Sequence, residues 1–503
     1  MEPVVITRYG RVRGQWCDGV ARFLGIPYAA SPTGALRFRA PVPPLAWEGT
    51  READRFGATP PKPAYPVPFD TLLPEPDIAG DDWLTVNVWT PDPGQVSLPV
   101  MVWIHGGAFA NGNSAIPSYD GQAFARDGVV LVSLNYRLGI DGFALLPDAP
   151  ANRGLLDQIA ALEWVRDNIA AFGGDPGNVT VFGESAGAMS VTTLLSLPRA
   201  HGLFARAIAQ SGSTQAVADV ADAALVAKEL GVALGRSATA ASLAEVSLPE
   251  LIAAQVAVRD ALAAQPDPAR FGPTIVASTM AFIPVADGTL IAEHPAAAIT
   301  AGAGAQIPLL TGTTADEFRL FLVPTGLAAL ITEEALPGLL TAMGIAAPVA
   351  DVYRASRPDD SPGDRLAAML TDRFFRLPAL AIAEARSAWQ AAAKDPQAPT
   401  YVYEFAWPSP VSGLGACHSL EIPFVFDNLS ADGAELALGA EPPQALADRM
   451  HAAWVAFACD GDPGWRAFDE KYPVMIFDAD SSGVQQDPRG KERESWAPHS
   501  QAS

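Results

Sequence analysis

Apolar stretches alternate with amphipathic ones along the first half of the chain, and this alternation predicts strands separated by helices. Predominantly apolar segments at residues 84–89, 100–104 and 129–135 have the length and composition of buried strands. Residues 155–172 instead repeat apolar side chains every three or four positions, as a helix does. A further strand over 179–182 follows. The pattern predicts an α/β fold in which helices cover both faces of a large, mostly parallel sheet.

The second half of the chain shows the same strands more widely spaced. Residues 307–310 and 401–405 are strand-like, and long Ala- and Leu-rich segments separate them from the preceding strands. We expect a single domain over residues 1–503, with helical insertions at about 216–300 and 327–394. No internal repeat or long linker interrupts this arrangement.

The periphery of the pattern is less regular. Residues 4–13 and 20–26 are short strand-like runs that predict an antiparallel start to the sheet. The Pro-rich stretch 59–76 predicts an ordered surface loop, and the polar tail after Pro488 is expected to fray.

Composition and charge narrow the classes of partner. A chain of 503 residues that is 49% hydrophobic and 18% charged builds a large globular core. Its net charge of −23 argues against nucleic-acid and anionic-membrane partners, because both require clustered Lys and Arg. No apolar run approaches the roughly 18 residues that span a bilayer. The N-terminus also lacks the features of a secretory signal.

The cysteines suggest a reducing compartment. Cys17, Cys417 and Cys459 are odd in number, widely separated and without metal-ligand spacing. We therefore expect a cytoplasmic protein that is a monomer or a small homo-oligomer and binds no metal.

A candidate nucleophile lies between a strand and a helix. Residues 183–187 read Gly-Glu-Ser-Ala-Gly, directly after the strand at 179–182 and before a helix expected over 188–196. Such a strand-to-helix turn exposes the serine hydroxyl, and the flanking glycines permit the close backbone packing that the turn creates. Ser185 is the predicted nucleophile.

A second glycine-rich turn follows the strand at 100–104. Residues 105–108 read His-Gly-Gly-Ala, and small residues let a loop present backbone N–H groups to a tetrahedral oxyanion. Ala186, the residue after the nucleophile, supplies another expected donor. We interpret His105 as an orienting or packing residue.

The base and the acid complete the set. Of six histidines, His418 lies in a Gly-rich loop after the strand at 401–405, where a catalytic base is expected. Its neighbour Cys417 suggests a Cys–His dyad, but sequence neighbours rarely face each other. The orienting carboxylate is Asp316 or Glu317, and local reasoning does not choose between them. The chain order Ser, acid, His is that of α/β-hydrolases.

Motifs along nearly the whole chain resemble the type-B carboxylesterase/cholinesterase family, and within it the bacterial para-nitrobenzyl-esterase-like carboxylesterases. The matching blocks are Gly-Ile-Pro-Tyr-Ala at 25–29, Leu-Arg-Phe at 36–38, Asp-Trp-Leu-Thr-Val-Asn-Val-Trp at 82–89, Asn-Tyr-Arg-Leu-Gly at 135–139, Asn-Arg-Gly-Leu-Leu-Asp-Gln at 152–158, Phe-Gly-Glu-Ser-Ala-Gly at 182–187, Gln-Ser-Gly at 210–212 and Glu-Ile-Pro-Phe-Val-Phe at 421–426. The resemblance implies an α/β-hydrolase fold whose helical insertions roof the active site.

The resemblance also assigns individual roles. It implies that Glu317 is the triad acid and that Gly107, Ala108 and Ala186 form the oxyanion hole. It implies an ion pair between Asp81 and Arg37.

The chain departs from the family pattern at two blocks. Phe318 replaces the glycine that follows the family's acid, which could narrow the pocket. Residues 81–84 read Asp-Asp-Trp-Leu and lack the cysteine of secreted members, in agreement with a reducing compartment.

These residues predict a carboxylic ester hydrolase that works through Ser185, His418 and Glu317 by a covalent acyl-enzyme, without metal or organic cofactor. Small apolar esters, aryl or short-chain alkyl, are the expected substrates, although Phe109 and the other aromatics near the motifs, Phe318 and Phe321, are core residues on a competing interpretation. The same triad could cleave carbamates or amides. A non-catalytic binding protein of this fold would have lost a triad member, and all three are present.

Overall fold

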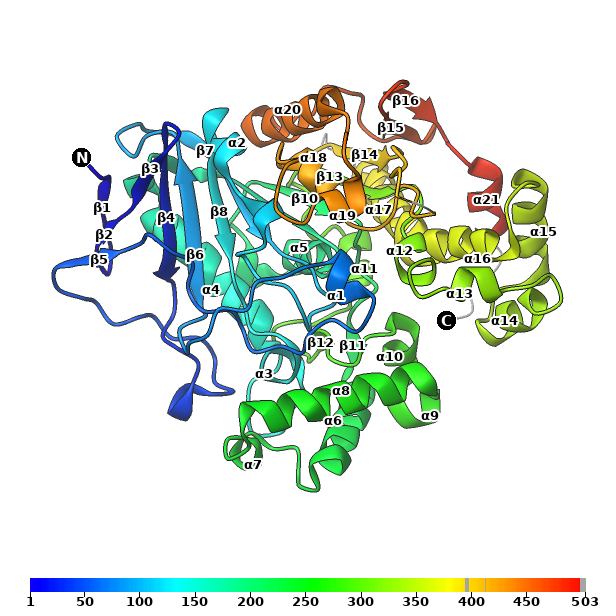
Figure 1. Ribbon diagram of the computed structural model, residues 1–503, viewed down its shortest axis with the longest axis horizontal. Coiled ribbons are helices and arrows are strands. Elements are labelled where there is room, and N and C mark those ends of the chain that lie inside the picture. The colour runs from blue at the N-terminus through cyan, green and yellow to red at the C-terminus, as the bar shows by residue number, and fades with distance from the viewer. Residues whose placement is uncertain (394–397, 412, 498–503) are drawn as a thin grey trace.

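The computed structural model describes residues 1–393, 398–411 and 413–497. Within them an 11-stranded sheet crosses the molecule (Figure 1) in the order β16-β15-β14-β13-β10-β9-β7-β8-β6-β4-β3. Its strands are β3 (Gln15–Cys17), β4 (Val20–Pro27), β6 (Thr85–Thr90), β7 (Leu98–Ile104), β8 (Val130–Leu134), β9 (Gly174–Glu184), β10 (Arg206–Gln210), β13 (Leu309–Thr314), β14 (Thr400–Phe405), β15 (Pro473–Phe477) and β16 (Gly483–Gln486).

The centre of this sheet is parallel and its margins are antiparallel. Neighbouring strands from β8 to β15 run parallel. At the margins, β6 pairs antiparallel with β8 and β4, β3 with β4, and β16 with β15. At the N-terminus, β1 (Val4–Thr7) and β2 (Gly10–Arg13) form an antiparallel pair in a separate small sheet with β5 (Thr50–Glu52). The predicted parallel centre and antiparallel start are both confirmed.

Side chains of β7 show how the sheet is covered on both faces. Val100, Val102 and Ile104 belong to the apolar cluster that includes α4 (Arg153–Asn168) and α5 (Ala186–Ser196). Met101 and Trp103, which alternate with them, belong to the cluster that includes α2 (Gln122–Arg126) and α20 (Gln444–Asp460). Because strand side chains alternate between faces, helices cover both sides of the sheet, as the apolar strands predict.

Two helical insertions interrupt the second half of the sheet (Figure 1). Between β10 and β13 lie a short β11 (Ala218–Asp219) and β12 (Val285–Ala286) pair and the helices α6 (Val220–Leu234), α7 (Ala240–Leu243), α8 (Leu248–Ala264), α9 (Pro268–Phe271), α10 (Pro273–Ser278) and α11 (Pro295–Thr300). Between β13 and β14 lie α12 (Arg319–Leu322), α13 (Leu327–Leu330), α14 (Leu336–Ala342), α15 (Ala347–Ser356), α16 (Pro362–Thr371), a π-helical turn (Asp372–Arg376) and α17 (Leu377–Ala393). Residue 394, the predicted end of the second insertion, lies outside the described residues.

Three expectations from the sequence need correction. The Pro-rich stretch 59–76 is ordered and includes α1 (Phe69–Leu72), but it is not simply a surface loop, because the Lys62 and Glu75 side chains are only 6% and 9% exposed. After Pro488 the chain forms α21 (Gly490–Ser495) rather than fraying at once; residues 498–503 lie outside the described residues.

The third correction concerns Arg37. Its Nε forms an ion pair with Asp141 Oδ1 at 3.2 Å, rather than with Asp81, and its Nη1 donates to the carbonyl oxygen of Val246 at 3.0 Å. Asp81 contributes its backbone carbonyl to a hydrogen bond from Ser31.

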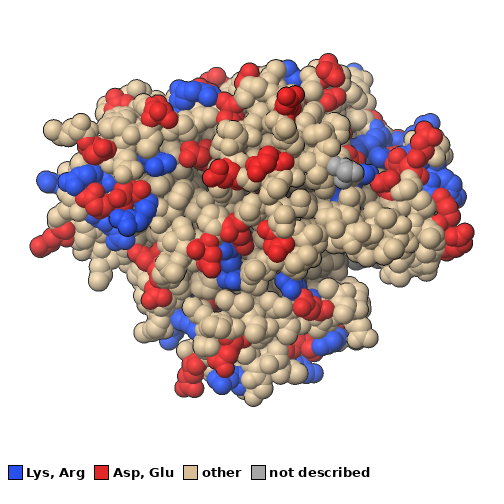
Figure 2. Space-filling view, in the orientation of Figure 1, with Lys and Arg blue, Asp and Glu red and all other residues tan. Residues whose placement is uncertain are grey.

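The distribution of surface charge and the lengths of the helices are consistent with this fold. On the face shown in Figure 2, Lys and Arg are interspersed with Asp and Glu and do not gather into one stripe. Across residues 1–393, 398–411 and 413–497, no helix is both long and apolar enough to cross a membrane. Over that same part of the chain, no group of three or more His, Cys, Asp or Glu side chains could hold a metal ion.

Candidate active site

The sheet brings the four predicted motifs to one edge. The turns that contain them follow β7, β9, β13 and β14, which are all strands of the parallel centre. Carboxyl ends of parallel strands meet at the same edge of a sheet, and that edge is where ligands bind in open α/β folds. Segments far apart in sequence therefore meet around one cavity.

Ser185 occupies a strained position at the junction of β9 and α5. Its backbone has φ 56° and ψ −123°, which side chains other than glycine rarely adopt. Its N–H donates to the carbonyl oxygen of Gln210 at 2.9 Å, and its carbonyl oxygen accepts from Met189 N at 2.9 Å. A Cβ placed on Gly187 would lie 2.0 Å from the carbonyl oxygen of Ile104, so only glycine fits there. These contacts fix the serine at the N-terminus of α5.

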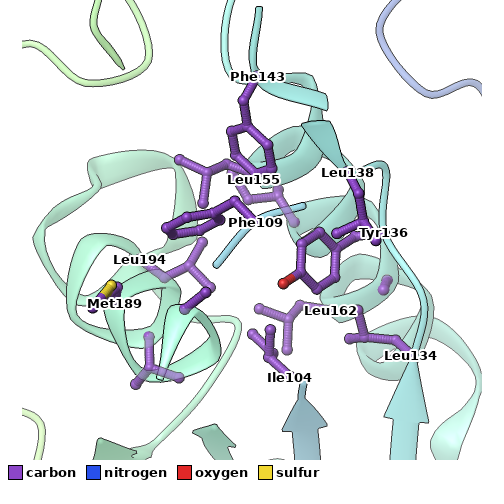
Figure 3. Packing of buried hydrophobic residues seen from close by; sticks show 14 of the residues in the cluster. Ile104, Phe109, Leu134, Tyr136, Leu138, Phe143, Leu155, Leu162, Met189 and Leu194 are labelled. Carbon is purple, nitrogen blue, oxygen red and sulfur yellow. The ribbon is translucent and has the colours of Figure 1, made fainter. Parts of the chain in front are cut away.

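The turn after β7 is held in an unusual conformation. Gly107, Ala108 and Phe109 have φ values of 106°, 54° and 58°. Phe109 is fully buried, and Figure 3 shows its ring in the core beside Phe143, whose ring centroid is 4.9 Å away. Phe109 therefore anchors the turn in the core, as the competing interpretation of the aromatics expects.

His105 is a packing residue in this structure. Its ring is fully buried and stacks on Tyr136 with centroids 4.5 Å apart, and its Nδ1 lies 2.8 Å from the carbonyl oxygen of Gly106. Burial lowers its pKa to about 4, so it stays neutral near pH 7.

His418 and Glu317 lie in direct contact. His418 Nδ1 is 2.6 Å from Glu317 Oε2, and Glu317 Oε1 accepts a hydrogen bond from Thr314 N at 2.9 Å. Because the carboxylate accepts at Nδ1, that nitrogen bears the proton in the neutral imidazole, and Nε2 is then the basic nitrogen. Asp316 points elsewhere, and its Oδ2 accepts from Ala416 N at 3.0 Å. The geometry thus separates the two acids that local sequence reasoning left open.

The alternative partner for His418 has a different environment. Burial and the nearby Glu317 raise the pKa of the Cys417 thiol to about 12. The thiol is therefore protonated and unreactive near neutral pH, which argues against a Cys–His dyad.

Two buried carboxylates beside His418 were not predicted from the sequence. Glu184 Oε1 lies 3.1 Å from His418 Nε2 and accepts a hydrogen bond from Ser419 Oγ at 2.6 Å. Glu421 Oε1 accepts from Gln210 Nε2 at 3.1 Å, and its Oε2 is buried with no hydrogen-bond partner among the described residues. A glutamate set among apolar neighbours, as in Leu-Glu-Ile-Pro-Phe at 420–424, is the signal that could have indicated Glu421.

These carboxylates and the imidazole shift one another's protonation. Burial raises the pKa of Glu184 to about 7, and burial together with the Glu184 charge raises that of Glu421 to about 8. Burial alone would lower the pKa of His418, but Glu184 and Glu317 outweigh it and raise this pKa to about 9. The site therefore favours the imidazolium and holds protons on part of its carboxylates.

A cavity of about 390 Å³ opens onto these groups. Ser185 and His418 line it together with Gly107 and Ala108. Much of its remaining wall is apolar and comes from separate segments: Tyr65, Leu72 and Leu73 from the 59–78 segment, Met280 from the first insertion, Phe318, Phe321, Phe374 and Phe375 from the second, and Leu420, Ile422 and Leu438 from the segment after His418. Of the aromatics considered from the sequence, Phe318 and Phe321 are thus cavity residues and Phe109 is not.

The sheet topology and the Gly-x-Ser-x-Gly turn between β9 and α5 define an α/β-hydrolase. The family model described as the carboxylesterase family matches residues 1–496, and the chain belongs to this family. It is 39% identical over 512 residues to the para-nitrobenzyl esterase of Bacillus subtilis, covering 98% of each chain. It is 34% identical over 500 residues to the fumonisin B1 esterase of Sphingopyxis macrogoltabida, covering 94% of this chain and 85% of that one.

A solved structure agrees with these matches. A Geobacillus stearothermophilus carboxylesterase superposes with a TM-score of 0.84 at 38% identity, covering 98% of this chain and 99% of that chain. The protein is accordingly a serine carboxylic ester hydrolase, and the resemblance seen in its sequence motifs is confirmed.

Proposed function

We propose that Ser185, His418 and Glu317 are the catalytic triad and that the protein hydrolyses small apolar esters, aryl or short-chain alkyl. The main support is the 2.6 Å contact between His418 and Glu317 beside a cavity that Ser185 also lines. In the neutral imidazole this contact holds the proton on Nδ1, which is the tautomer that a serine hydrolase needs, because Nε2 is then the nitrogen that accepts the serine proton.

The reaction proceeds in two halves. Ser185 Oγ attacks the acyl carbon while His418 Nε2 takes the hydroxyl proton, and the resulting oxyanion accepts hydrogen bonds from backbone N–H groups of Gly107, Ala108 and Ala186. Collapse breaks the ester bond, and His418 returns the proton to the departing alcohol. Water then attacks the acyl-serine by the same proton path, which releases the acid and regenerates Ser185.

The cavity supports the choice of substrate class. Its apolar walls favour apolar substituents through the hydrophobic effect, and about 390 Å³ is within the range of small-molecule sites. The Bacillus subtilis relative is named for para-nitrobenzyl esters, which agrees with aryl groups in this cavity.

We propose a single domain over 1–503, because residues of the sheet turns, such as Ser185, and residues of the insertions at 216–300 and 327–394 line the same cavity. The cytoplasmic location and the monomeric or small homo-oligomeric state stay predictions.

A chromogenic ester series tests this function. para-Nitrophenyl esters from acetate to decanoate, with a phenyl carbamate alongside, are assayed with wild type and Ser185→Ala before and after treatment with an organophosphate. We expect a chain-length optimum, loss of at least about 10⁴-fold in kcat for Ser185→Ala, and a phosphoryl adduct on Ser185 by mass spectrometry. Substantial turnover by Ser185→Ala would refute the nucleophile, and faster turnover of the carbamate would refute the substrate class.

A further inference from the structure

The segment from Thr59 to Ile78 forms a closed loop beside the active site. Thr59 N donates to the carbonyl oxygen of Ile78 at 3.0 Å, and Ile78 N donates to Thr59 Oγ1 at 3.1 Å, so the two ends of the loop are joined. Inside it, Lys62 Nζ lies 3.6 Å from Glu75 Oε1, and both side chains are buried. A buried ion pair of this kind is destabilising unless its remaining polar atoms are also satisfied.

Glu75 finds its other partners in the segment that follows the oxyanion turn. Its Oε2 accepts a hydrogen bond from Gly112 N at 2.8 Å. Two further hydrogen bonds run in parallel, from Asn111 Nδ2 to the carbonyl oxygen of Pro63 at 2.6 Å and from Asn113 Nδ2 to that of Pro76 at 3.0 Å. The carboxylate thus joins the loop to a backbone amide outside it.

That amide lies directly against the proposed oxyanion donors. The carbonyl oxygen of Gly107 accepts from the N–H groups of Ala110 and Asn111 at 2.9 and 2.8 Å. A Cβ on Gly107 would lie 2.3 Å from the carbonyl oxygen of Asn111, and one on Gly112 would lie 2.4 Å from that of Gly106. Because residues 106–107 and 111–112 pack against each other this closely, a shift of Gly112 moves Gly106 and Gly107 as well.

The turn is therefore fixed at two places. Phe109 holds it on the core side, packed against Phe143 (Figure 3). On the other side the only charged side chain that accepts from its backbone in the described part of the chain is Glu75. Lys62 faces this carboxylate, and burial raises the Glu75 pKa while Lys62 and the Gly112 N–H oppose that rise.

We propose that Glu75 is a positioning residue of the oxyanion hole: it holds the Gly112 amide, and through it sets the Gly107 and Ala108 N–H groups at the place where the oxyanion forms. This inference rests on the proposed function, in which those N–H groups stabilise the tetrahedral intermediate. It also links the cavity wall to the chemistry, because Leu72 and Leu73 of the same loop line the cavity.

Three variants at this position separate the possible reasons for an effect. Glu75→Ala removes the acceptor, Glu75→Asp keeps the charge but withdraws the oxygen by one methylene, and Glu75→Gln keeps an oxygen that reaches Gly112 N. Asp77→Ala is the matched control, because Asp77 is an exposed acid of the same loop that accepts from Thr59 Oγ1 at 3.2 Å and, within the described part of the chain, forms no hydrogen bond or ion pair with the oxyanion turn.

The readouts are kcat, KM and the inhibition constant of an aryl trifluoromethyl ketone, which forms a tetrahedral adduct with an active serine. We expect Glu75→Ala and Glu75→Asp to lower kcat by about 10- to 100-fold with KM changed less than about threefold, because a misplaced donor costs less than a deleted one. The affinity for the ketone should fall in parallel with kcat/KM. Glu75→Gln should keep at least about a third of kcat, and Asp77→Ala should change kcat less than about twofold.

The proposal is overturned if Glu75→Asp keeps wild-type kcat and ketone affinity, if Glu75→Gln loses as much as Glu75→Asp, or if Asp77→Ala loses as much as either. Should Glu75→Ala fail to fold, the Gln and Asp variants decide, with folding monitored by near-UV circular dichroism. Failure of the proposed function has a different signature, namely ester turnover by Ser185→Ala in the wild-type loop background.

Discussion

Two buried clusters of charged side chains lie close together in this protein, and their composition differs. The first, the site cluster, surrounds the imidazole with acids and consists of His418, Glu184, Glu317 and Glu421. The second, the lobe cluster, pairs acids with guanidinium groups and consists of Arg357, Asp372, Arg376, Glu404, Arg489 and Glu492. The site cluster is rich in carboxylates, whereas the lobe cluster balances its charges.

The balance determines whether the groups stay ionised. In the lobe cluster, burial would raise the pKa of Asp372, but Arg376 at 2.5 Å holds it below its ordinary value. In the site cluster, burial raises the pKa of Glu184, and the positive charge of the His418 imidazolium offsets that rise only in part. Paired ions of fixed charge stabilise a geometry, whereas surplus carboxylates put titration within reach of neutral pH, as acid–base chemistry requires.

The lobe cluster nevertheless serves the site. Asp372 and Arg376 are the first and last residues of the π-helical turn that presents Phe374 and Phe375 to the cavity. The ring of Phe375 lies 4.8 Å from that of His418, centroid to centroid. The balanced cluster thus holds a wall against which the imidazole packs, and its disruption should act on stability more than on chemistry.

The largest effect is expected from Glu317→Gln in the site cluster. The amide does not fix the Nδ1–H tautomer of His418, so kcat should fall by about 10⁴-fold while the fold persists, as the hydrogen bond from Thr314 N can still form. Steady-state kinetics with a para-nitrophenyl ester and thermal melting measure the two properties. Asp316→Asn is the control, and a comparable loss there would contradict the choice of acid.

Glu492→Gln in the lobe cluster should have the opposite effect, with a large loss of stability and a small change in kcat. Glu492 accepts from Arg357 Nε at 2.9 Å and from Ser356 Oγ at 2.7 Å, and its side chain is almost completely buried. Removing one partner of a buried pair leaves an uncompensated cation, so we expect about 3 kcal/mol less stability toward unfolding, with kcat changed less than about threefold. Urea titration gives the stability. A large loss of kcat without loss of stability would contradict the division between the two clusters.

Glu184→Gln should change the pH profile. Glu184 raises the pKa of His418, so its neutralisation should lower that pKa and move the acidic limb of kcat/KM to lower pH. Glu184 also stabilises the imidazolium that forms when Ser185 loses its proton, so the plateau should fall by about tenfold, the equivalent of one pKa unit. An unmoved limb would show that Glu184 does not act on His418. Asp316→Asn, whose carboxylate faces Ala416 N, should leave the limb in place.

The sequence predicted the parts of the site that depend on local pattern. Apolar strands followed by Gly-rich turns indicated Ser185 and the turn at 105–108, and parallel strands implied that such turns meet. Local pattern could not choose between Asp316 and Glu317, because adjacent residues point in different directions that only the turn decides. Nor could it predict the Lys62–Glu75 pair, because long-range contacts between polar residues in a Pro-rich loop leave no periodic signal.

The smallest effect on activity is expected from Glu421→Gln. This variant tests whether Glu421, one of the surplus acids of the site cluster, is protonated at neutral pH. Burial and the Glu184 charge raise the pKa of Glu421 from 4.5 to about 8. At pH 7 its side chain is then mostly neutral, and glutamine is nearly isosteric with it, so kcat should change less than about twofold.

Glu421→Gln should change the pH dependence of stability more than it changes kcat. Between about pH 4.5 and 8 the folded wild type retains a proton on Glu421 that the unfolded chain releases, so this group makes wild type progressively less stable as the pH rises through that interval. Glu421→Gln lacks this dependence, so the melting temperature of the variant minus that of wild type should increase from pH 5 to pH 8. Melting curves across that range measure the gap. A constant gap would mean that Glu421 is ionised throughout, and that the two clusters differ in composition but not in protonation.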